Sequence, residues 1–188
     1  MIPLIQVEGR AFPLPLNNVD TDLIIPAAYL KTTRRQGLGQ HAFAALRGTD
    51  DNPFEDPLYE GALILLALDN FGCGSSREHA AWAIADLGIR VVIATSFSDI
   101  FAGNAFKNGI ATVELERAKV ERLIDATSAG TILSIDLNQL TVSTSRGDRF
   151  EFTMDPFRRA CLMDGLDEIG LTLACEPAIS AYEQRVGI

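Results

Sequence analysis

Short apolar runs alternate with longer segments of helical spacing through the middle of the chain. The runs ALILLAL (62–68) and RVVIAT (90–95) are too short for typical helices and predict strands buried on both faces. ATVEL (111–115) predicts a third strand, while 76–87, 96–109 and 117–130 have helical spacing. This alternation from 62 to 130 predicts a largely parallel sheet with helices packed on it.

The flanking regions follow a different rhythm. Residues 4–16 predict one or two short strands broken at Gly9-Arg10. After residue 130, alternating segments predict three strands, with a turn at Arg146-Gly147-Asp148. The remaining expectations are a short helix over 155–165, a helical tail from Glu176, helical spacing over 40–47 and a surface loop over 50–57. No repeat or linker interrupts the chain, so we expect one α/β domain over 1–188.

Composition narrows the class of protein. The net charge of −9 disfavours a nucleic-acid binder, which needs a clustered basic face. No apolar run reaches the roughly 18 residues that a membrane span requires. The N-terminus lacks the pattern of a secretory signal, which favours a cytoplasmic location. Three dispersed cysteines and two histidines predict neither a disulfide framework nor a metal site in this chain.

The stretch FGCGSSREH (71–79) lies at a strand-to-helix junction and permits three interpretations. Dinucleotide binding is disfavoured because Arg77 stands where the third glycine of the fingerprint belongs. A nucleophile elbow is disfavoured because no glycine stands two residues after the serine. His79 is better explained by a local hydrogen bond beneath the loop than by catalysis. Cys73 is better explained as a small loop residue than as a redox thiol.

An anion site at a helix N-terminus is the third interpretation. Ser75 and Glu78 have the spacing of a capping box, which predicts that the helix begins at Ser75 or Ser76. Free backbone N–H groups, two hydroxyls and the Arg77 guanidinium would together bind a carboxylate. A cap alone would leave the second serine, the glycines and the arginine unexplained.

Four segments in order resemble the small subunit of 3-isopropylmalate dehydratase, the detached counterpart of the swivelling domain of aconitase. They are NVDTDLIIP (18–26), FGCGSSREH (71–79), SFSDIFAGNAFKNG (96–109) and FTMDPFRRACLMDGLDEIGLTL (152–173). The resemblance implies a swivelling β/β/α domain like aconitase domain 4, with a mixed, mostly parallel sheet flanked by helices. It also implies interconversion of 2-isopropylmalate and 3-isopropylmalate by dehydration and rehydration in leucine biosynthesis.

The resemblance further implies a large partner subunit. That subunit carries a 4Fe-4S cluster, whereas this chain is expected to hold no cofactor. The expected assembly is a heterodimer or a dimer of heterodimers. A homoaconitase or 2-methylmalate dehydratase small subunit is the close alternative, and a stand-alone carboxylate-binding module is an alternative from another class.

Residue roles follow from the same resemblance. Ser75 takes the place of the serine base, and Ser76 and Arg77 match residues that hold the substrate and stabilise the ionised serine. Asp22 matches an aspartate that faces the other domain. An arginine that binds a substrate carboxylate matches either Arg34 or Arg35. The specificity candidates in the same 27–37 loop are Leu30, Lys31 and Thr32.

A serine base needs help that one chain cannot supply. Ionising its hydroxyl near neutral pH requires a shift of roughly seven pKa units, about 9–10 kcal/mol. A helix terminus offers at most about 2 kcal/mol and an arginine hydrogen bond about 1.5–3 kcal/mol. The rest must come from a closed, water-poor site between two subunits. We therefore predict that the isolated chain is inactive.

Overall fold

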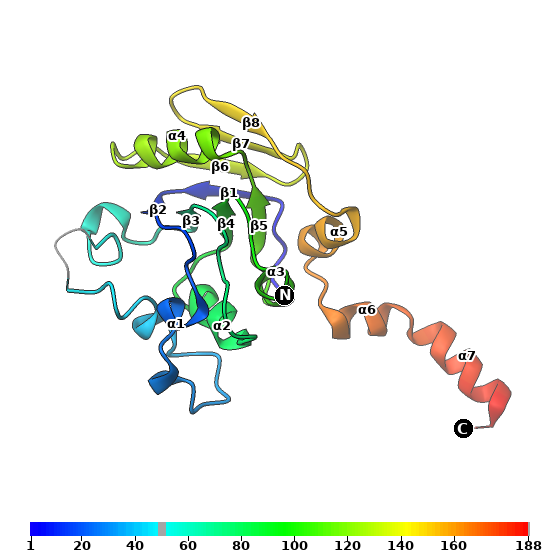
Figure 1. Ribbon diagram of the computed structural model, residues 1–188. Helices are drawn as coiled ribbons and strands as arrows, with labels where there is room; N and C mark the ends of the chain where they lie inside the picture. The colour runs from blue at the N-terminus through cyan, green and yellow to red at the C-terminus, as the bar shows by residue number, and fades with distance from the viewer. Residues whose placement is uncertain (49–51, 188) are drawn as a thin grey trace.

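The computed structural model describes residues 1–48 and 52–187, and its strands form two four-stranded sheets. The first is all-parallel in the order β2-β3-β4-β5: β2 (Ala11–Leu14), β3 (Ile64–Ala67), β4 (Val91–Ala94) and β5 (Ala111–Glu114). The second is antiparallel in the order β1-β6-β7-β8: β1 (Gln6–Gly9), β6 (Leu133–Asp136), β7 (Thr141–Thr144) and β8 (Arg149–Glu151). In Figure 1 the antiparallel sheet lies above the parallel one.

The α-helices are α1 (Thr21–Ile24), α2 (Glu78–Asp86), α3 (Asp99–Lys107), α4 (Arg117–Thr127), α5 (Pro156–Asp164), α6 (Glu168–Ala174) and α7 (Glu176–Val186). Short 3-10 helices at Ala27–Tyr29, Gly39–His41 and Pro57–Tyr59 complete the order of the described elements. The predicted α/β class is confirmed, with the parallel and antiparallel strands in separate sheets rather than in one mixed sheet. Asp50 and Asp51 of the predicted surface loop lie outside the described residues.

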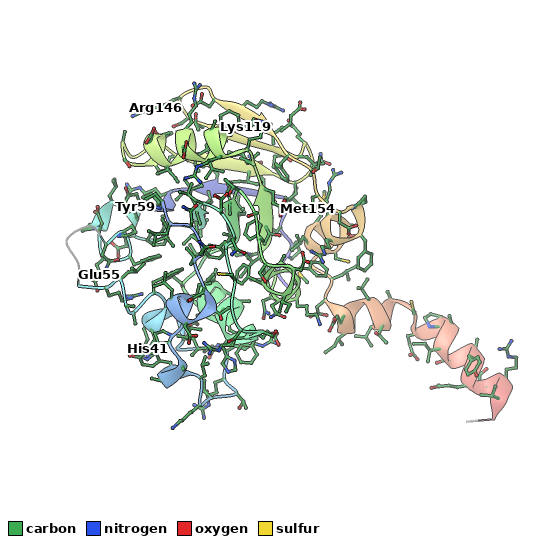
Figure 2. The ribbon with its side chains drawn as sticks, viewed as in Figure 1. His41, Glu55, Tyr59, Lys119, Arg146 and Met154 are labelled. Carbon is green, nitrogen blue, oxygen red and sulfur yellow. The ribbon has the colours of Figure 1, made fainter. Side chains whose placement is uncertain are left out.

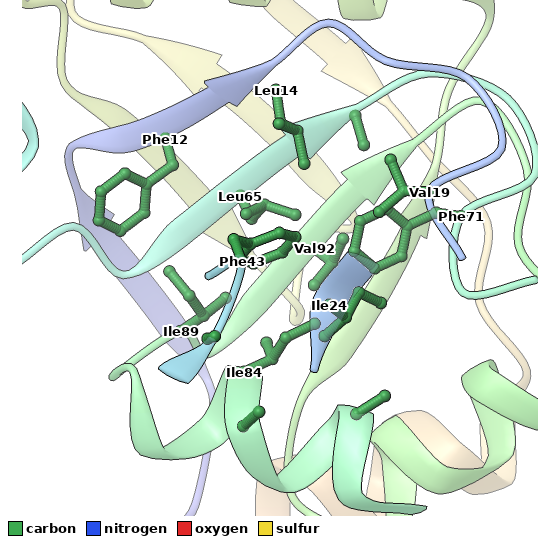
Figure 3. Close-up of a cluster of buried hydrophobic side chains, with 14 of the residues drawn as sticks. Phe12, Leu14, Val19, Ile24, Phe43, Leu65, Phe71, Ile84, Ile89 and Val92 are labelled. Carbon is green, nitrogen blue, oxygen red and sulfur yellow. The ribbon is translucent and has the colours of Figure 1, made fainter. Parts of the chain in front are cut away.

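Burial explains why the parallel strands are continuously apolar. Every residue of β3 and β4 is buried, because a hydrophobic cluster covers each face of the sheet. On one face Ile24 of α1, Ile84 of α2 and Leu65 of β3 belong to the same buried cluster (Figure 3). On the other face the cluster draws on the antiparallel sheet and α4, through residues such as Ile135 and Leu123. The two clusters hold the carboxyl ends of the parallel strands in fixed positions.

The helix predicted over 40–47 is wrong. Only a single 3-10 turn forms, at Gly39–His41, and Phe43 has a left-handed backbone with φ of 54°. The Phe43 ring is fully buried and stacks on Phe54 with 4.3 Å between ring centroids. Burying this ring outweighs the weak local preference for a helix, because propensity contributes only tenths of a kcal/mol per residue.

The C-terminal helices extend away from the body of the protein (Figure 1). Neither α6 nor α7 contains a buried residue. The polar links from this segment to the body include an ion pair between Lys107 and Glu168 (2.9 Å) and one between the Met1 ammonium and Asp167 (3.5 Å). Among residues 1–48 and 52–187, no helix is long and apolar enough to cross a membrane.

Candidate active site

The loop of residues 71–77, here named the glycine loop, follows β3 at the carboxyl edge of the parallel sheet. Its backbone is joined to the segment that precedes α1. The N–H of Gly72 donates to the carbonyl of Val19 (2.7 Å), and the N–H of Thr21 donates to the carbonyl of Cys73 (2.9 Å). These bonds fix the loop from one side.

A second segment fixes the glycine loop from the other side. The N–H of Phe71 donates to the carbonyl of Ser96, and the N–H of Ser98 donates to the carbonyl of Phe71, both at 3.0 Å. The Phe71 ring is fully buried and packs edge-on against Phe101. Thus three motifs that are distant in sequence, at 18–26, 71–79 and 96–109, meet at one edge of the sheet.

Packing and backbone geometry explain the two glycines. At Gly72 φ is +76°, and a Cβ atom would lie 2.2 Å from Cγ of Phe101. At Gly74 φ is +93°, and a Cβ atom would lie 3.5 Å from the Thr21 hydroxyl oxygen. Only glycine adopts both backbones without strain. Neither glycine therefore needs an anion to explain its presence.

Helix α2 begins at Glu78, so the predicted start at Ser75 or Ser76 and the predicted capping box are wrong. Arg77 is the N-cap, and no side chain caps the helix. The Glu78 carboxylate instead accepts hydrogen bonds from Trp82 Nε1 and Asn108 Nδ2, each at 3.1 Å. These two donors satisfy the carboxylate more fully than one backbone N–H would.

The two serines are exposed at the end of the glycine loop. Within the described part of the chain, neither hydroxyl has a hydrogen-bond partner, whereas the backbone carbonyl of Ser75 accepts two hydrogen bonds. The Ser75 carbonyl accepts from the Thr21 hydroxyl (3.2 Å) and from the N–H of Arg77 (2.8 Å). The Ser75 side chain is therefore free to meet a reactant while its backbone stays fixed. Sequence reasoning missed Thr21, although it lies within the motif at 18–26.

The Arg77 guanidinium forms an ion pair with Asp22 at the start of α1. The Arg77 side chain is 23% exposed and that of Asp22 is 55% exposed. The pair therefore lies at the surface, beside the serines. Asp20, two residues earlier, caps α1 by accepting from the N–H of Leu23 (2.7 Å).

The structure separates the two arginines of the predicted 27–37 loop, which continues to Gly39 and is here named the 27–39 loop. Arg35 lies over the Trp82 ring, 5.3 Å from its centroid, and 3.9 Å from Glu78 Oε1. The Arg34 guanidinium is exposed and has no polar partner among residues 1–48 and 52–187. Arg34 is therefore available to a ligand, whereas Arg35 is held by α2.

The three specificity candidates lie next to Arg34 in the same loop. Leu30 and Thr32 are half-buried and Lys31 is exposed. The loop also folds on itself, because Tyr29 stacks on His41 with ring centroids 3.9 Å apart (His41 is labelled in Figure 2). This stack joins the two ends of the segment that carries the candidates.

His79 does not lie beneath the glycine loop. Its Nε2 is 3.0 Å from the carbonyl of Thr32, and its ring packs on Trp82. A carbonyl only accepts, so this hydrogen bond requires the proton on Nε2. A local hydrogen bond was expected for His79, but its partner lies in the 27–39 loop.

The described residues offer no metal site in this chain. No group of three or more His, Cys, Asp or Glu side chains comes together within residues 1–48 and 52–187. Of the cysteines, Cys161 is buried, Cys175 is exposed and Cys73 is intermediate. The residues present do not fit an iron–sulfur cluster.

Fold and site together define an aconitase-type α/β subunit, and comparisons with known proteins agree. The Aconitase C-terminal domain model matches residues 1–118. The 3-isopropylmalate dehydratase small subunit of Novosphingobium aromaticivorans is 56% identical over 186 residues, covering 99% of this chain and 92% of that protein. The small subunit of Zymomonas mobilis is 58% identical over 177 residues, covering 94% and 92%. A crystal structure of 3-isopropylmalate dehydratase from Methanocaldococcus jannaschii has a TM-score of 0.76 at 29% identity, covering 95% of this chain and 99% of that one. The chain belongs to the family of 3-isopropylmalate dehydratase small subunits.

Proposed function

We propose that this chain is the small subunit of an isopropylmalate isomerase, interconverting 2-isopropylmalate and 3-isopropylmalate by dehydration and rehydration in leucine biosynthesis. The relatives above support this substrate through their names and their near-complete coverage of the chain. The designation of those relatives as small subunits implies a large partner subunit. We place the 4Fe-4S cluster there, in a heterodimer or a dimer of heterodimers.

Ser75 is the base in this proposal, and the carrying observation is its geometry. Its hydroxyl is exposed and without a partner in the described chain, while two hydrogen bonds fix its carbonyl. In dehydration the ionised Ser75 oxygen takes the proton from the carbon next to a substrate carboxylate. The C–H electron pair becomes the C=C bond as hydroxide leaves the adjacent carbon, and the large subunit's cluster would supply the Lewis acid for that hydroxide. In rehydration the Ser75 hydroxyl returns a proton to carbon. A fixed backbone with a free side chain suits this exchange, because proton transfer requires a hydrogen-bonding distance to the reacting carbon.

Arg77 and Ser76 hold the charges around that oxygen. The Arg77 guanidinium donates several N–H groups from one plane, so it can bind Asp22 and still face an oxyanion or a carboxylate. Ser76, the next exposed hydroxyl, donates to the substrate. Asp22 orients Arg77 and lies on the surface that meets the large subunit.

Arg34 binds the second substrate carboxylate. Its guanidinium is unengaged within the described residues, whereas that of Arg35 contacts Trp82 and Glu78. Leu30, Lys31 and Thr32 then contact the isopropyl group or its equivalent in another malate. This side-chain contact distinguishes isopropylmalate from the substrates of homoaconitase and 2-methylmalate dehydratase.

The large subunit completes the site. Ser75 and Ser76 are exposed to water in this chain, and water weakens the electrostatic terms that would ionise a serine. Covering them with a second subunit excludes that water, so the chain alone has no activity.

A reconstitution assay tests the proposal. A cluster-loaded large subunit, kept at low oxygen, receives this chain, and the unsaturated intermediate is followed by absorbance with 3-isopropylmalate, 2-methylmalate or homoisocitrate. We expect turnover of 3-isopropylmalate by the pair and none by either subunit alone. Higher kcat/KM for one of the other acids would overturn the substrate assignment, and turnover by this chain alone would overturn the half-site.

A further inference from the structure

Helix α2 contacts the 27–39 loop through residues in the first turn, the middle and the last turn of the helix. In its first turn His79 Nε2 donates to the carbonyl of Thr32 (3.0 Å). In its last turn Asp86 Oδ2 accepts from the N–H groups of Gly37 (2.9 Å) and Gly39 (2.7 Å). The loop is therefore tied to the helix at both ends.

A third contact lies between these two. The guanidinium of Arg35 packs over Trp82, which stands between the two tied ends. Glu78, Trp82 and Asp86 follow one another at four-residue spacing, which places them along one side of a helix. One side of α2 therefore faces the 27–39 loop.

Asp86 stands where a negative charge interacts unfavourably with the helix dipole, so its presence there needs a reason. An acidic side chain in the last turn of a helix is unfavourable, and α2 has no basic residue there. Two loop N–H groups offset that cost by donating to its carboxylate. Gly39 also fits this contact closely, since a Cβ atom there would lie 2.6 Å from the backbone carbon of Asp86.

Glu78 supports the middle contact. Burial raises the pKa of its carboxyl. Hydrogen bonds from Asn108 and Trp82 and the charges of Arg35 and Lys107 together lower that pKa by more than burial raises it, so the net shift is downward. The group is therefore a carboxylate at neutral pH. As a carboxylate it holds the Trp82 indole N–H and attracts Arg35.

We propose that His79, Glu78 and Asp86 are positioning residues that hold the 27–39 loop against α2 and thereby place Arg34 for the substrate carboxylate. Arg34 lies between Thr32 and Arg35, both of which contact α2. The same helix begins directly after Ser75, Ser76 and Arg77. One rigid element therefore sets the distance between the base and the carboxylate-binding arginine. This inference rests on the proposed role of Arg34.

Asp86→Ala is the direct test, because it removes the acceptor of two defined backbone N–H groups. In the isolated chain we expect the amides of Gly37 and Gly39 to exchange with deuterium about tenfold faster or more. In the reconstituted enzyme we expect KM for 3-isopropylmalate to rise about tenfold while kcat changes by less than about threefold. Asp125→Ala is the matched control, since Asp125 is an exposed carboxylate on α4.

A conservative variant separates positioning from loss of folding. Asp86→Asn keeps an acceptor oxygen, so it should recover most of the slow exchange and most of the low KM. Exchange at Gly37 and Gly39 that stays within about twofold of wild type in Asp86→Ala would overturn the proposal. Faster exchange with unchanged KM would also overturn it, because the loop would then not place a substrate-binding group. If the wild-type pair turned over no malate homologue, the proposed function would fail, while the exchange measurement would still decide whether α2 holds the loop.

Discussion

Arg77 is paired with Asp22 across 55 residues of sequence, and this ion pair joins the glycine loop to α1. The pair lies beside two serine hydroxyls that have no partner within residues 1–48 and 52–187. It therefore holds a cation next to the oxygen that must become an anion in the proposed reaction.

Asp22→Asn should lower catalysis more than stability. An exposed ion pair contributes about 0–1 kcal/mol to folding, so the unfolding temperature should change little. Loss of the orienting charge should lower kcat by about tenfold to a hundredfold, because Arg77 would no longer be held beside Ser75. Steady-state kinetics of the reconstituted pair and thermal unfolding of the chain measure the two effects. An unchanged kcat would show that the pair has no part in the reaction.

Gly72→Ala should destabilise the fold strongly. The added Cβ atom would lie 2.2 Å from Phe101 Cγ, at a φ of +76° that alanine adopts only with strain. Overpacking and backbone strain together should lower the free energy of unfolding by about 2–5 kcal/mol.

Gly103→Ala is the matched control for that substitution. Gly103 lies within α3, and a Cβ atom there would meet nothing within 4 Å. The control should raise the free energy of unfolding by up to about 1 kcal/mol, because alanine favours helix. Denaturant unfolding of both variants decides the matter. Equal stabilities would contradict the close approach of Gly72 to Phe101.

Glu78→Gln should change the pH dependence of stability. Although burial raises the pKa of Glu78, hydrogen bonds from Asn108 and Trp82 with nearby charges leave it below its ordinary value of 4.5. A depressed carboxyl pKa stabilises the folded state above the unfolded pKa, and this contribution is lost as pH falls through the folded value. The wild type should therefore exceed the variant in unfolding temperature at pH 7, and the gap should shrink at pH values well below 4.5. A gap that stays constant from pH 7 to about pH 3 would contradict the lowered pKa.

Removing residues 167–188 should leave the fold intact. Helices α6 and α7 bury no side chain, and the ion pairs lost are those of Asp167 and Glu168. The Lys107–Glu168 pair is exposed and the Met1–Asp167 pair is long at 3.5 Å, so both contribute little and the unfolding temperature should fall by no more than about 5 °C. Removing α5 as well should unfold the chain, because Cys161 and Leu162 are buried. A large loss from the shorter deletion would mean that α6 or α7 packs on the body in solution.

The sequence predicts the fold best where local pattern and burial agree. The apolar runs of β3 and β4 and the short helix α5 are read correctly from local pattern. The 40–47 helix is wrong because the buried stack of Phe43 on Phe54 overrides its local spacing. The predicted start of α2 is wrong because Glu78 binds Asn108, a partner 30 residues away.

The candidate site was likewise predictable from sequence only where its residues are neighbours in the chain. Motif spacing brings Ser75, Ser76 and Arg77 together, since they are neighbours in sequence. Asp86 is separated in sequence from its partners Gly37 and Gly39 by 49 and 47 residues, so no local sequence pattern predicts these hydrogen bonds. The distinction between Arg34 and Arg35 likewise depends on Trp82, which only the folded chain brings to Arg35. Long-range contacts therefore decide which of two adjacent arginines is free for a ligand.

The most direct test of the account is kcat for Ser75→Ala in the reconstituted pair. We expect kcat for 3-isopropylmalate to fall by about a thousandfold or more while affinity for the large subunit stays unchanged. Cys73→Ala, two residues away in the same loop, is the control and should keep wild-type turnover. A Ser75→Ala pair that retains more than about a tenth of wild-type kcat would contradict the assignment of Ser75 as the base.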